Sequence, residues 1–277
     1  MRVLVTGADG YIGQHVVSCL VARGHFVVAM DAHFDNKLEG VEYVVTNIFE
    51  DDLRAYIKDI DVVIHLAYRD GFRHMSDAHM EDLHKHVKFV EKLCSNGLKQ
   101  IVIMGSMHEI GYHEGAITEK TPCNPMNYYG IAKNALREAS TLICDKYGSI
   151  LQWVRAYYIT GDEMRGSNVF TKITQAYNEG KRTFPLNSGK NLYDFLDIDE
   201  LAYQITKVAE QTAVSGIINC CSGKPVSLLM KIQEFIKDKG YDMTLDIGAF
   251  PDRPYDSPGV WGDNTKIEMI LRGDKNV

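Results

Sequence analysis

The chain has 277 residues, of which 45% are hydrophobic and 24% are charged, so it can bury a globular core as one large domain or as one domain with a smaller lobe. Its 30 lysines and arginines against 37 aspartates and glutamates give a net charge of −7 with no block of like charges, which disfavours nucleic acids and membrane surfaces as partners. No apolar run approaches the roughly 18 residues that span a bilayer, and we expect no signal peptide because residues 3–5 already have the composition of a strand.

Short apolar segments alternate with amphipathic ones through residue 156. We expect strands at residues 2–5, 26–30, 41–45, 61–66, 100–104 and 151–156, and helices at residues 11–23, 76–95 and 126–147. Gly24, Gly97 and Gly148 would end these three helices. Strands that alternate with helices of this length are typical of a doubly wound parallel sheet in the α/β class.

The pattern becomes less regular after residue 157. Residues 161–191 are rich in glycine, asparagine and charge, with one expected helix near residues 169–180. Farther along we expect a helix at 198–211, a strand at 216–220 and a helix at 228–239. We therefore predict a larger domain over residues 1–160, to which residues 194–222 return, and a small C-terminal α/β lobe made of residues 161–193 and 223–277.

Gly7, Gly10 and Gly13 lie between the first strand and the first helix. Gly7 permits a tight turn, Gly10 lets a pyrophosphate approach the backbone, and Gly13 lets the helix pack close to the sheet. The free N–H groups of the helix N-terminus favour phosphates. Glycines in such turns can serve geometry alone, but a place between strand and helix is what a dinucleotide-binding loop requires.

Asp31 follows the second strand directly and can accept a hydrogen bond from a ribose 2′-hydroxyl. Its charge would repel the 2′-phosphate of NADP, and no arginine or lysine occupies the next five positions. The alternative is a solvated loop acid, but the glycine loop lies upstream at the expected distance. We therefore predict NAD as the cofactor, with NADP the less favoured one.

Tyr129 and Lys133 are four residues apart and share one face of a predicted helix. Ser106 lies at the end of the fifth strand, at the carboxyl edge of the sheet where ligands bind. An unperturbed tyrosine has a pKa of about 10, and we expect a neighbouring ammonium and an oxidised nicotinamide to lower it. A Tyr-x-x-x-Lys pair is common by chance, and it gains weight here from the glycine loop, Asp31 and Ser106.

With these motifs the chain resembles the extended short-chain dehydrogenases/reductases, in particular their NAD-dependent nucleotide-sugar epimerase/dehydratase group. The resemblance runs from Met1 to about Lys266 and includes His65-Leu66-Ala67, residues 193–202 and Arg253-Pro254. It implies a Rossmann-type fold with a small substrate lobe. It also implies hydride transfer at C4 of a nucleoside-diphosphate sugar, by a 4-epimerase or a 4-keto-6-deoxysugar reductase, and a homodimer.

The resemblance implies a role for each candidate residue. Tyr129 would be the catalytic acid/base, Ser106 would hydrogen-bond the reacting oxygen, and Lys133 would bind the nicotinamide ribose and tune Tyr129. The other implied cofactor contacts are Gly7, Gly10, Tyr11, Ile12, Gly13, Asp31, Asn47, Ile48, Leu66 and Ala67. The implied sugar-nucleotide contacts are Arg69, Ser106, Met107, Asn168, Tyr193 and Arg253, of which Arg253 is equally well read as an exposed loop charge.

Departures from the family pattern narrow the chemistry. Dehydratases of this group carry an Asp-Glu pair after the catalytic Ser or Thr, where this chain has Met107 and His108, so 4,6-dehydration is disfavoured. His108 is either a second acid/base or a packed histidine. Residues 105–111 resemble some 4-ketoreductases that make deoxyhexoses, whereas Asp31 and NAD favour an epimerase. Tyr158 and Tyr193 replace a common Asn and Arg, which leaves the sugar and the nucleotide open.

We expect no metal site. His79, His84 and His86 lie on one predicted helix, but 84 and 86 face opposite sides, and 79 and 86 lie roughly 10 Å apart along the axis. A solvated or interface face is the better interpretation. Residues 69–74 either cover the sugar or form a mobile surface loop.

Two further expectations concern the location and the rival function. The six cysteines include no Cys-x-x-Cys pair, which favours reduced thiols and a cytoplasmic location. The rival hypothesis is a non-catalytic NAD-binding sensor on the same fold. The complete set of Ser106, Tyr129 and Lys133 argues against it, since a sensor would not need all three.

Overall fold

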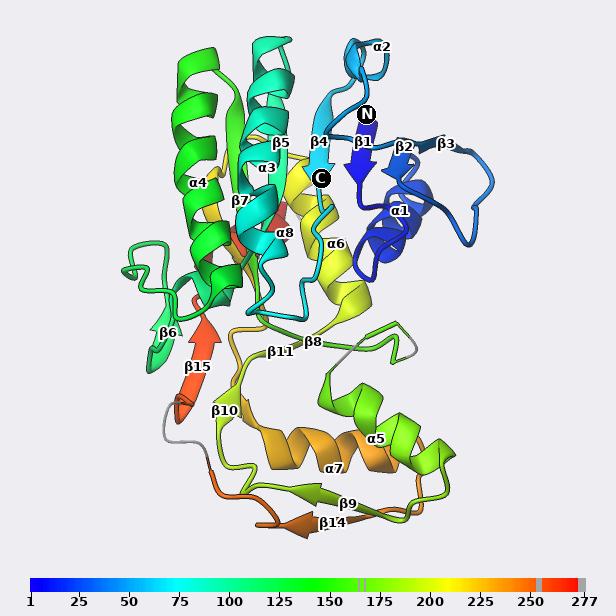
Figure 1. The fold of residues 1–277 in the computed structure, drawn as a ribbon, viewed down its shortest axis with the longest axis vertical. Helices are drawn as coiled ribbons and strands as arrows, with labels where there is room; N and C mark the ends of the chain where they lie inside the picture. Colours follow the sequence, from blue (N-terminus) through cyan, green and yellow to red (C-terminus); the bar gives the residue numbers. More distant parts are fainter. Residues whose placement is uncertain (164, 167, 253–255, 274–277) are drawn as a thin grey trace.

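The computed structural model describes residues 1–163, 165–166, 168–252 and 256–273, and Figure 1 shows its ribbon. The larger part of the molecule is a seven-stranded parallel sheet with strand order β12-β7-β5-β4-β1-β2-β3. Its strands are β1 (Arg2–Thr6), β2 (Phe26–Asp31), β3 (Val41–Val45), β4 (Val62–His65), β5 (Gln100–Ser106), β7 (Ile150–Ala156) and β12 (Gly216–Cys220). This order confirms the doubly wound α/β sheet expected from the sequence.

Successive residues of a strand face opposite sides of the sheet, so each buried strand contributes to two hydrophobic cores. Val3 and Val5 of β1 pack with α1 (Gly13–Ala22), α6 (Ile198–Ala209) and α8 (Thr265–Gly273). Leu4 packs on the other face with α2 (Arg54–Ile57), α3 (Ala78–Ser95) and α4 (Tyr128–Tyr147). Burial on both faces explains why the strands are continuous apolar runs rather than alternating ones.

A second, smaller group of elements lies below the sheet in Figure 1. Helices α5 (Val169–Asn178) and α7 (Leu228–Asp238) pack over the parallel strand pair β9 (Thr183–Leu186) and β14 (Thr244–Ile247). Phe170, Ile173 and Ile232 lie in the core that they share. Helix α8, from the range that the sequence assigned to the small lobe, packs instead against α6 and β12 of the large sheet.

The expected helices and strands are all present, with small differences at their ends. The sequence prediction missed α2, α8, the 3₁₀ turn η1 (Met107–Glu109) and eight short strands. These strands are β6 (Gly115–Ile117), β8 (Tyr158–Thr160), β9, β10 (Leu192–Tyr193), β11 (Phe195–Asp197), β13 (Val226–Ser227), β14 and β15 (Gly259–Gly262). Strands this short show no clear alternation, and long-range pairing determines where they form.

Asp194 links the large sheet to these short strands. It is fully buried between β10 and β11. Its carboxylate accepts hydrogen bonds from the N–H groups of Ser222, Gly223 and Gly262 at 2.8, 2.9 and 3.1 Å, and from Ser222 Oγ at 2.6 Å. The Asp194 side chain therefore joins the segment between β10 and β11 to the residues that follow β12 and to the end of β15, at the boundary between the sheet and the lobe.

We expect Asp194→Asn to lower the free energy of unfolding by about 3 kcal/mol, because the amide group presents N–H donors to backbone N–H groups that are buried. Urea denaturation followed by circular dichroism measures this loss. The matched control is Asp238→Asn at the exposed end of α7, which should leave the midpoint unchanged. Equal midpoints for the two variants would contradict the role assigned to Asp194.

Candidate active site

One cavity of about 1540 Å³ lies at the carboxyl edge of the large sheet and is lined by both parts of the molecule. Strand β1 has β4 on one side and β2 on the other, so the strand order reverses there, and open parallel sheets bind ligands at such points. All the expected cofactor contacts line this cavity: Gly7, Gly10, Tyr11, Ile12, Gly13, Asp31, Asn47, Ile48, Leu66, Ala67, Tyr129 and Lys133. Ser106, His108, Arg69, Asn168 and Tyr193 line it as well.

The glycine loop forms the cavity wall at the end of β1. Gly7 has a φ of +68°, and a Cβ there would lie 2.5 Å from Ala67 N. A Cβ on Gly13 would lie 2.0 Å from Gly7 O, so only glycine lets α1 begin this close to the loop. The free N–H groups at the N-terminus of α1 are thereby brought to the cavity, where they suit a pyrophosphate.

The Asp31 carboxylate is held at the wall next to this loop. Its Oδ2 accepts the N–H of Asp9 at 2.9 Å, and its Oδ1 accepts the N–H of Ala32 at 2.7 Å. The group therefore lies at the end of β2 as a fixed acceptor, which is what recognition of a ribose hydroxyl requires. Together the glycine loop and Asp31 fit the adenosine half of NAD.

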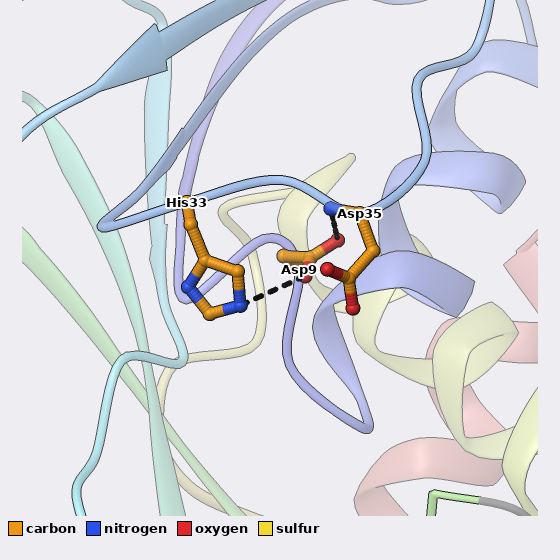
Figure 2. A group of neighbouring side chains, drawn as sticks. All are labelled: Asp9, His33 and Asp35. Carbon is orange, nitrogen blue, oxygen red and sulfur yellow. Dashed lines mark hydrogen bonds and ion pairs between the residues drawn. The ribbon is translucent and has the colours of Figure 1, made fainter.

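Further charged groups lie next to Asp31, around Asp9, whose N–H bonds the Asp31 carboxylate. Figure 2 shows Asp9, His33 and Asp35 together: His33 Nε2 lies 3.7 Å from Asp9 Oδ2, and the Asp35 N–H donates to Asp9 Oδ1 at 3.4 Å. The Arg165 guanidinium lies 3.8 Å from Asp9 Oδ2 and 3.3 Å from Asp35 Oδ2. Because an arginine of the chain already pairs with both carboxylates, we assign no metal ion to this group.

Helix α4 supplies the tyrosine and the lysine at the opposite end of the cavity. Asn127 caps the helix by accepting the Gly130 N–H at 2.8 Å, so Tyr129 lies in the first turn and Lys133 one turn later. Lys133 is buried, and its Nζ donates to the Met104 carbonyl at 2.7 Å. The ring of Tyr68 lies 3.6 Å from the same Nζ. The ammonium is thus fixed between the end of β5 and an aromatic face.

Burial controls the ionisation of both groups. It raises the pKa of Tyr129 to about 12, against the effect of a hydrogen bond from Ser106. It lowers the pKa of Lys133 to about 7, while the charge of Glu109 acts in the opposite direction. In the protein alone burial thus outweighs the lowering expected from the neighbouring ammonium, and the part of that lowering expected from an oxidised nicotinamide stays a prediction.

Histidines and a second tyrosine surround Tyr129. His74 stacks on its ring at 5.1 Å, and His108 lies 4.2 Å from the His74 ring. Burial lowers the pKa of His108 to about 4, so its imidazole is neutral at neutral pH. His79 and His86 are 2% exposed and both stack on Tyr68. The solvated or interface face expected for them is wrong, since Tyr68 covers that side of α3; His84 alone of the three is exposed.

Two of the expected sugar contacts, Arg69 and Asn168, already make hydrogen bonds within the protein. Arg69 already bonds Glu81 and Asp82, each at 2.9 Å. Asn168 caps α5 by accepting the Phe170 and Thr171 N–H groups, and its Nδ2 donates to the Ile159 carbonyl at 3.0 Å.

Of three further expected sugar contacts, Tyr193 lines the cavity, Met107 does not, and Arg253 lies outside the described residues. Tyr193 packs on the Tyr158 ring at 4.2 Å and lines the cavity. Met107 packs in a hydrophobic cluster with Ile110 and is absent from the cavity wall, because the η1 turn directs it inward.

Several residues in the cavity wall were missed by the sequence interpretation. They are Tyr68, Asp82, His86, Lys172, Phe184 and Phe250. Lys172 follows Asn168 by one helical turn, a spacing that would have placed both on one face. Residues 69–74 all line the cavity, which favours the interpretation of this segment as a cover.

This chain matches a protein-family model and known enzymes over most of its length. The model of a family described as "NAD dependent epimerase/dehydratase family" matches residues 3–221. The chain is 41% identical to dTDP-6-deoxy-L-talose 4-dehydrogenase (NAD(+)) of Aggregatibacter actinomycetemcomitans, over 95% of this chain and 99% of that protein. It is 23% identical to UDP-glucose 4-epimerase of Lactobacillus helveticus, over 98% of this chain and 91% of that protein.

Solved structures have the same fold. UDP-N-acetylglucosamine 4-epimerase from Methanobrevibacter ruminantium M1 superposes with a TM-score of 0.84 at 22% identity, over 97% of this chain and 91% of that one. UDP-glucuronic acid 4-epimerase from Bacillus cereus, in complex with UDP-glucuronic acid and NAD, superposes with a TM-score of 0.82 at 21% identity, over 98% and 93%.

Replacing Asp31 by asparagine should weaken the discrimination against NADP. The change removes a negative charge next to the position of the 2′-phosphate, an interaction of about 1 to 4 kcal/mol for unit charges 4 Å apart. We expect the ratio of the NADPH and NADH dissociation constants to fall by roughly tenfold, as measured by fluorescence titration. Asp35→Asn, at a side chain that is 62% exposed, is the control and should change the ratio little. An unchanged ratio in Asp31→Asn would remove Asp31 from the ribose site.

Proposed function

The chain belongs to the NAD-dependent epimerase/dehydratase family, and from that premise we propose that it is an NAD-dependent dehydrogenase that works reversibly at C4 of a nucleoside-diphosphate 6-deoxyhexose. One observation carries the proposal: Ser106, Tyr129 and Lys133 line one cavity together with the glycine loop and Asp31. The 41% identity to a dTDP-6-deoxy-L-talose 4-dehydrogenase supports a dTDP-linked sugar as the substrate.

The chemistry next to Ser106 supports a redox reaction without dehydration. Met107 packs away from the cavity and His108 is a neutral imidazole. Glu109, the remaining polar residue of the η1 turn, is fully buried and bonded to Trp153 and Arg155. No carboxylate of this turn therefore lines the cavity to remove water across C5 and C6 of a sugar.

Bound NAD would supply the hydride acceptor for C4, and NADH the donor in the reverse direction. In the oxidation Tyr129 accepts the proton of the 4-hydroxyl, and in the reduction its neutral phenol returns that proton to the ketone oxygen. Ser106 donates a hydrogen bond to the same oxygen. Lys133 binds the nicotinamide ribose and favours the phenolate when it is charged. The raised pKa of Tyr129 keeps the phenol neutral in the protein alone, which is the form that the reduction uses. The oxidation uses the phenolate, which a bound oxidised nicotinamide would favour, with the phenol proton released to solvent before the 4-hydroxyl proton is accepted.

The other candidate residues divide along the cavity. Residues 1–160 and 194–222 would bind NAD, through Gly7, Gly10, Tyr11, Ile12, Gly13, Asp31, Asn47, Ile48, Leu66 and Ala67. Residues 161–193 and 223–277, apart from helix α8 on the large sheet, would bind the sugar nucleotide, with Asn168 and Tyr193 on this side and Arg69 and His108 opposite. Arg253, outside the described residues, is proposed to bind the nucleotide as well. His108 would act as a hydrogen-bond partner of the sugar. Met107 would act by holding the η1 turn.

We also propose a homodimer in the cytoplasm. Helices α3 and α4 pack side by side, and Met80, Ile131 and Leu142 on them are 45%, 39% and 72% exposed. Large apolar side chains exposed on two adjacent helices support burial against a second copy. All six cysteines are free thiols, which supports a reducing compartment. None of the described helices is long and apolar enough to cross a membrane.

The direct test incubates the purified protein with NAD and a panel of dTDP- and UDP-linked hexoses and 6-deoxyhexoses. We expect NADH absorbance to rise in proportion to a 4-keto sugar formed, and the rate to be highest with a dTDP-6-deoxyhexose. An epimerase would instead give C4-inverted sugar without net NADH. A sensor would bind NAD and leave every sugar unchanged. Either result would contradict the proposed dehydrogenase.

Tyr129→Phe should lower kcat by about 10²- to 10⁴-fold, because general acid–base catalysis contributes that much. NAD affinity should stay within a few-fold of the wild-type value, as measured by fluorescence titration. Tyr128→Phe is the matched control, since it removes the neighbouring phenol of the same helix, which is 38% exposed. Near-normal turnover in Tyr129→Phe would exclude the proposed acid/base.

A further inference from the structure

Glu109 is a buried carboxylate in the η1 turn, which follows Ser106 directly. Its side chain and that of Arg155 are both fully buried. Glu109 Oε1 accepts the Ser106 N–H at 2.7 Å and the Trp153 Nε1–H at 2.8 Å, and Oε2 accepts the Arg155 Nε–H at 3.0 Å. The carboxylate therefore bonds to the backbone of the residue whose hydroxyl lines the cavity.

These bonds fix the conformation of Ser106. The serine has an extended backbone, with φ −157° and ψ 151°, and its Oγ accepts the His108 N–H at 3.2 Å. The Glu109 carboxylate and the Ser106 hydroxyl thus form a reciprocal capping box around the η1 turn. Because Ser106 Oγ is used as an acceptor inside the turn, its own hydrogen is left to donate to Tyr129 or to a substrate oxygen.

The sequence around the carboxylate is adapted to this arrangement. A Cβ on Gly105 would lie 2.6 Å from Glu109 Oε1 and 2.1 Å from Trp153 Nε1, so a glycine is needed where the carboxylate passes β5. Trp153 and Arg155 are two residues apart on β7 and face the same side of it. Strand β7 thus supplies donors to both oxygens of the carboxylate.

Stability alone is a poor explanation for this buried ion pair. Desolvating two charges costs about as much as their attraction returns, so such pairs are often neutral or destabilising compared with apolar side chains. Arg155 Nη1 has no hydrogen-bond partner among the described residues, and Arg137 Nε lies 3.8 Å from Glu109 Oε2. What the carboxylate does provide is a fixed acceptor for the Ser106 N–H.

We propose that Glu109 is a positioning residue for the C4 redox reaction: it holds the Ser106 main chain so that Ser106 Oγ faces the Tyr129 hydroxyl and the reacting sugar oxygen. The inference rests on the proposed catalytic roles of Ser106 and Tyr129. Glu109 does not line the cavity, so it positions the reacting groups through the Ser106 main chain, and its charge acts in addition on the ionisation of Tyr129 and Lys133.

Two substitutions separate position from charge. Glu109→Asp keeps the negative charge near Arg155 but withdraws the carboxylate by about 1.5 Å from the Ser106 N–H. Glu109→Gln keeps the length but removes the charge and turns an N–H toward donors of Ser106 or Arg155. Glu114→Gln, at an exposed glutamate shortly after the η1 turn, is the matched control.

We expect both Glu109 variants to lose kcat by about 10²-fold, because a misplacement on the order of 1 Å at the reacting atoms has that effect. The KM and the NAD dissociation constant should stay within about threefold of wild type, and Glu114→Gln should match wild type throughout. Glu109→Asp retains the ion pair and carries the test if Glu109→Gln does not fold. Wild-type kcat in Glu109→Asp would overturn the proposal, and so would a loss of NAD binding equal to the loss of kcat.

The pH profile provides a readout that a purely structural role would not change. The Glu109 charge raises the pKa of both Tyr129 and Lys133. Oxidation needs deprotonated Tyr129, so removing the charge in Glu109→Gln should move the limb that rises with pH to lower pH. Glu109→Asp should leave this limb in place. The other titratable groups that face Tyr129, which are Tyr68, His74, His79, His108 and Lys133, are the same in both variants.

Ser106→Ala, assayed in parallel, distinguishes failure of this inference from failure of the proposed function. If Ser106→Ala turns over normally, the catalytic role of Ser106 is wrong and the positioning role of Glu109 falls with it. If Ser106→Ala is slow while folded Glu109→Asp and Glu109→Gln have wild-type kcat and pH profiles, only the positioning role is wrong.

Discussion

Helix α4 brings a tyrosine and a lysine into the cavity because it packs directly on the turn that follows β5. A Cβ at Gly130 would lie 2.3 Å from the His108 carbonyl oxygen, so a larger residue there would push the helix away. The Tyr129 N–H donates to the His74 carbonyl at 3.0 Å, and Lys133 Nζ donates to the Met104 carbonyl at 2.7 Å. Because α4 packs on this turn, its first residues contact the loop at His74, the end of β5 and the η1 turn, which are distant from one another in the sequence.

The same close approach determines the electrostatics of the site. Lys133 is buried and Tyr129 is half-buried at the cavity wall, and this desolvation pushes both toward their neutral forms. Burial also keeps His108 neutral, which leaves it able to donate or accept hydrogen bonds but makes it a weak source of protons at neutral pH. Glu109 is the nearby fixed negative charge that raises the pKa of both groups. Since the protein alone favours the neutral phenol of Tyr129, we expect formation of the phenolate, and with it proton transfer at C4, to depend on the charges of the bound substrate and cofactor.

The sequence was sufficient to predict the parallel sheet, because its strands are buried on both faces and appear as apolar runs between amphipathic helices. Gly7, Asp31, Ser106 and Tyr129 were also predictable as cavity residues, since each lies at a strand end or in the first turn of a helix at that edge. The stacking of His79 and His86 on Tyr68 was not, because it depends on a loop folding back on α3. The inward direction of Met107 follows from the η1 turn, which only the bonds of Glu109 reveal.

Transfer of the C4 hydrogen tests the central claim most directly. The protein would be incubated with NAD and a dTDP-6-deoxyhexose carrying deuterium at C4. The cofactor and the sugar would then be separated, and the deuterium content of each measured by mass spectrometry. The account predicts deuterium in the free reduced cofactor and none at C4 of the 4-keto product. Deuterium retained at C4 in a mixture of both epimers, with the cofactor unlabelled in solution, would contradict it and identify an epimerase.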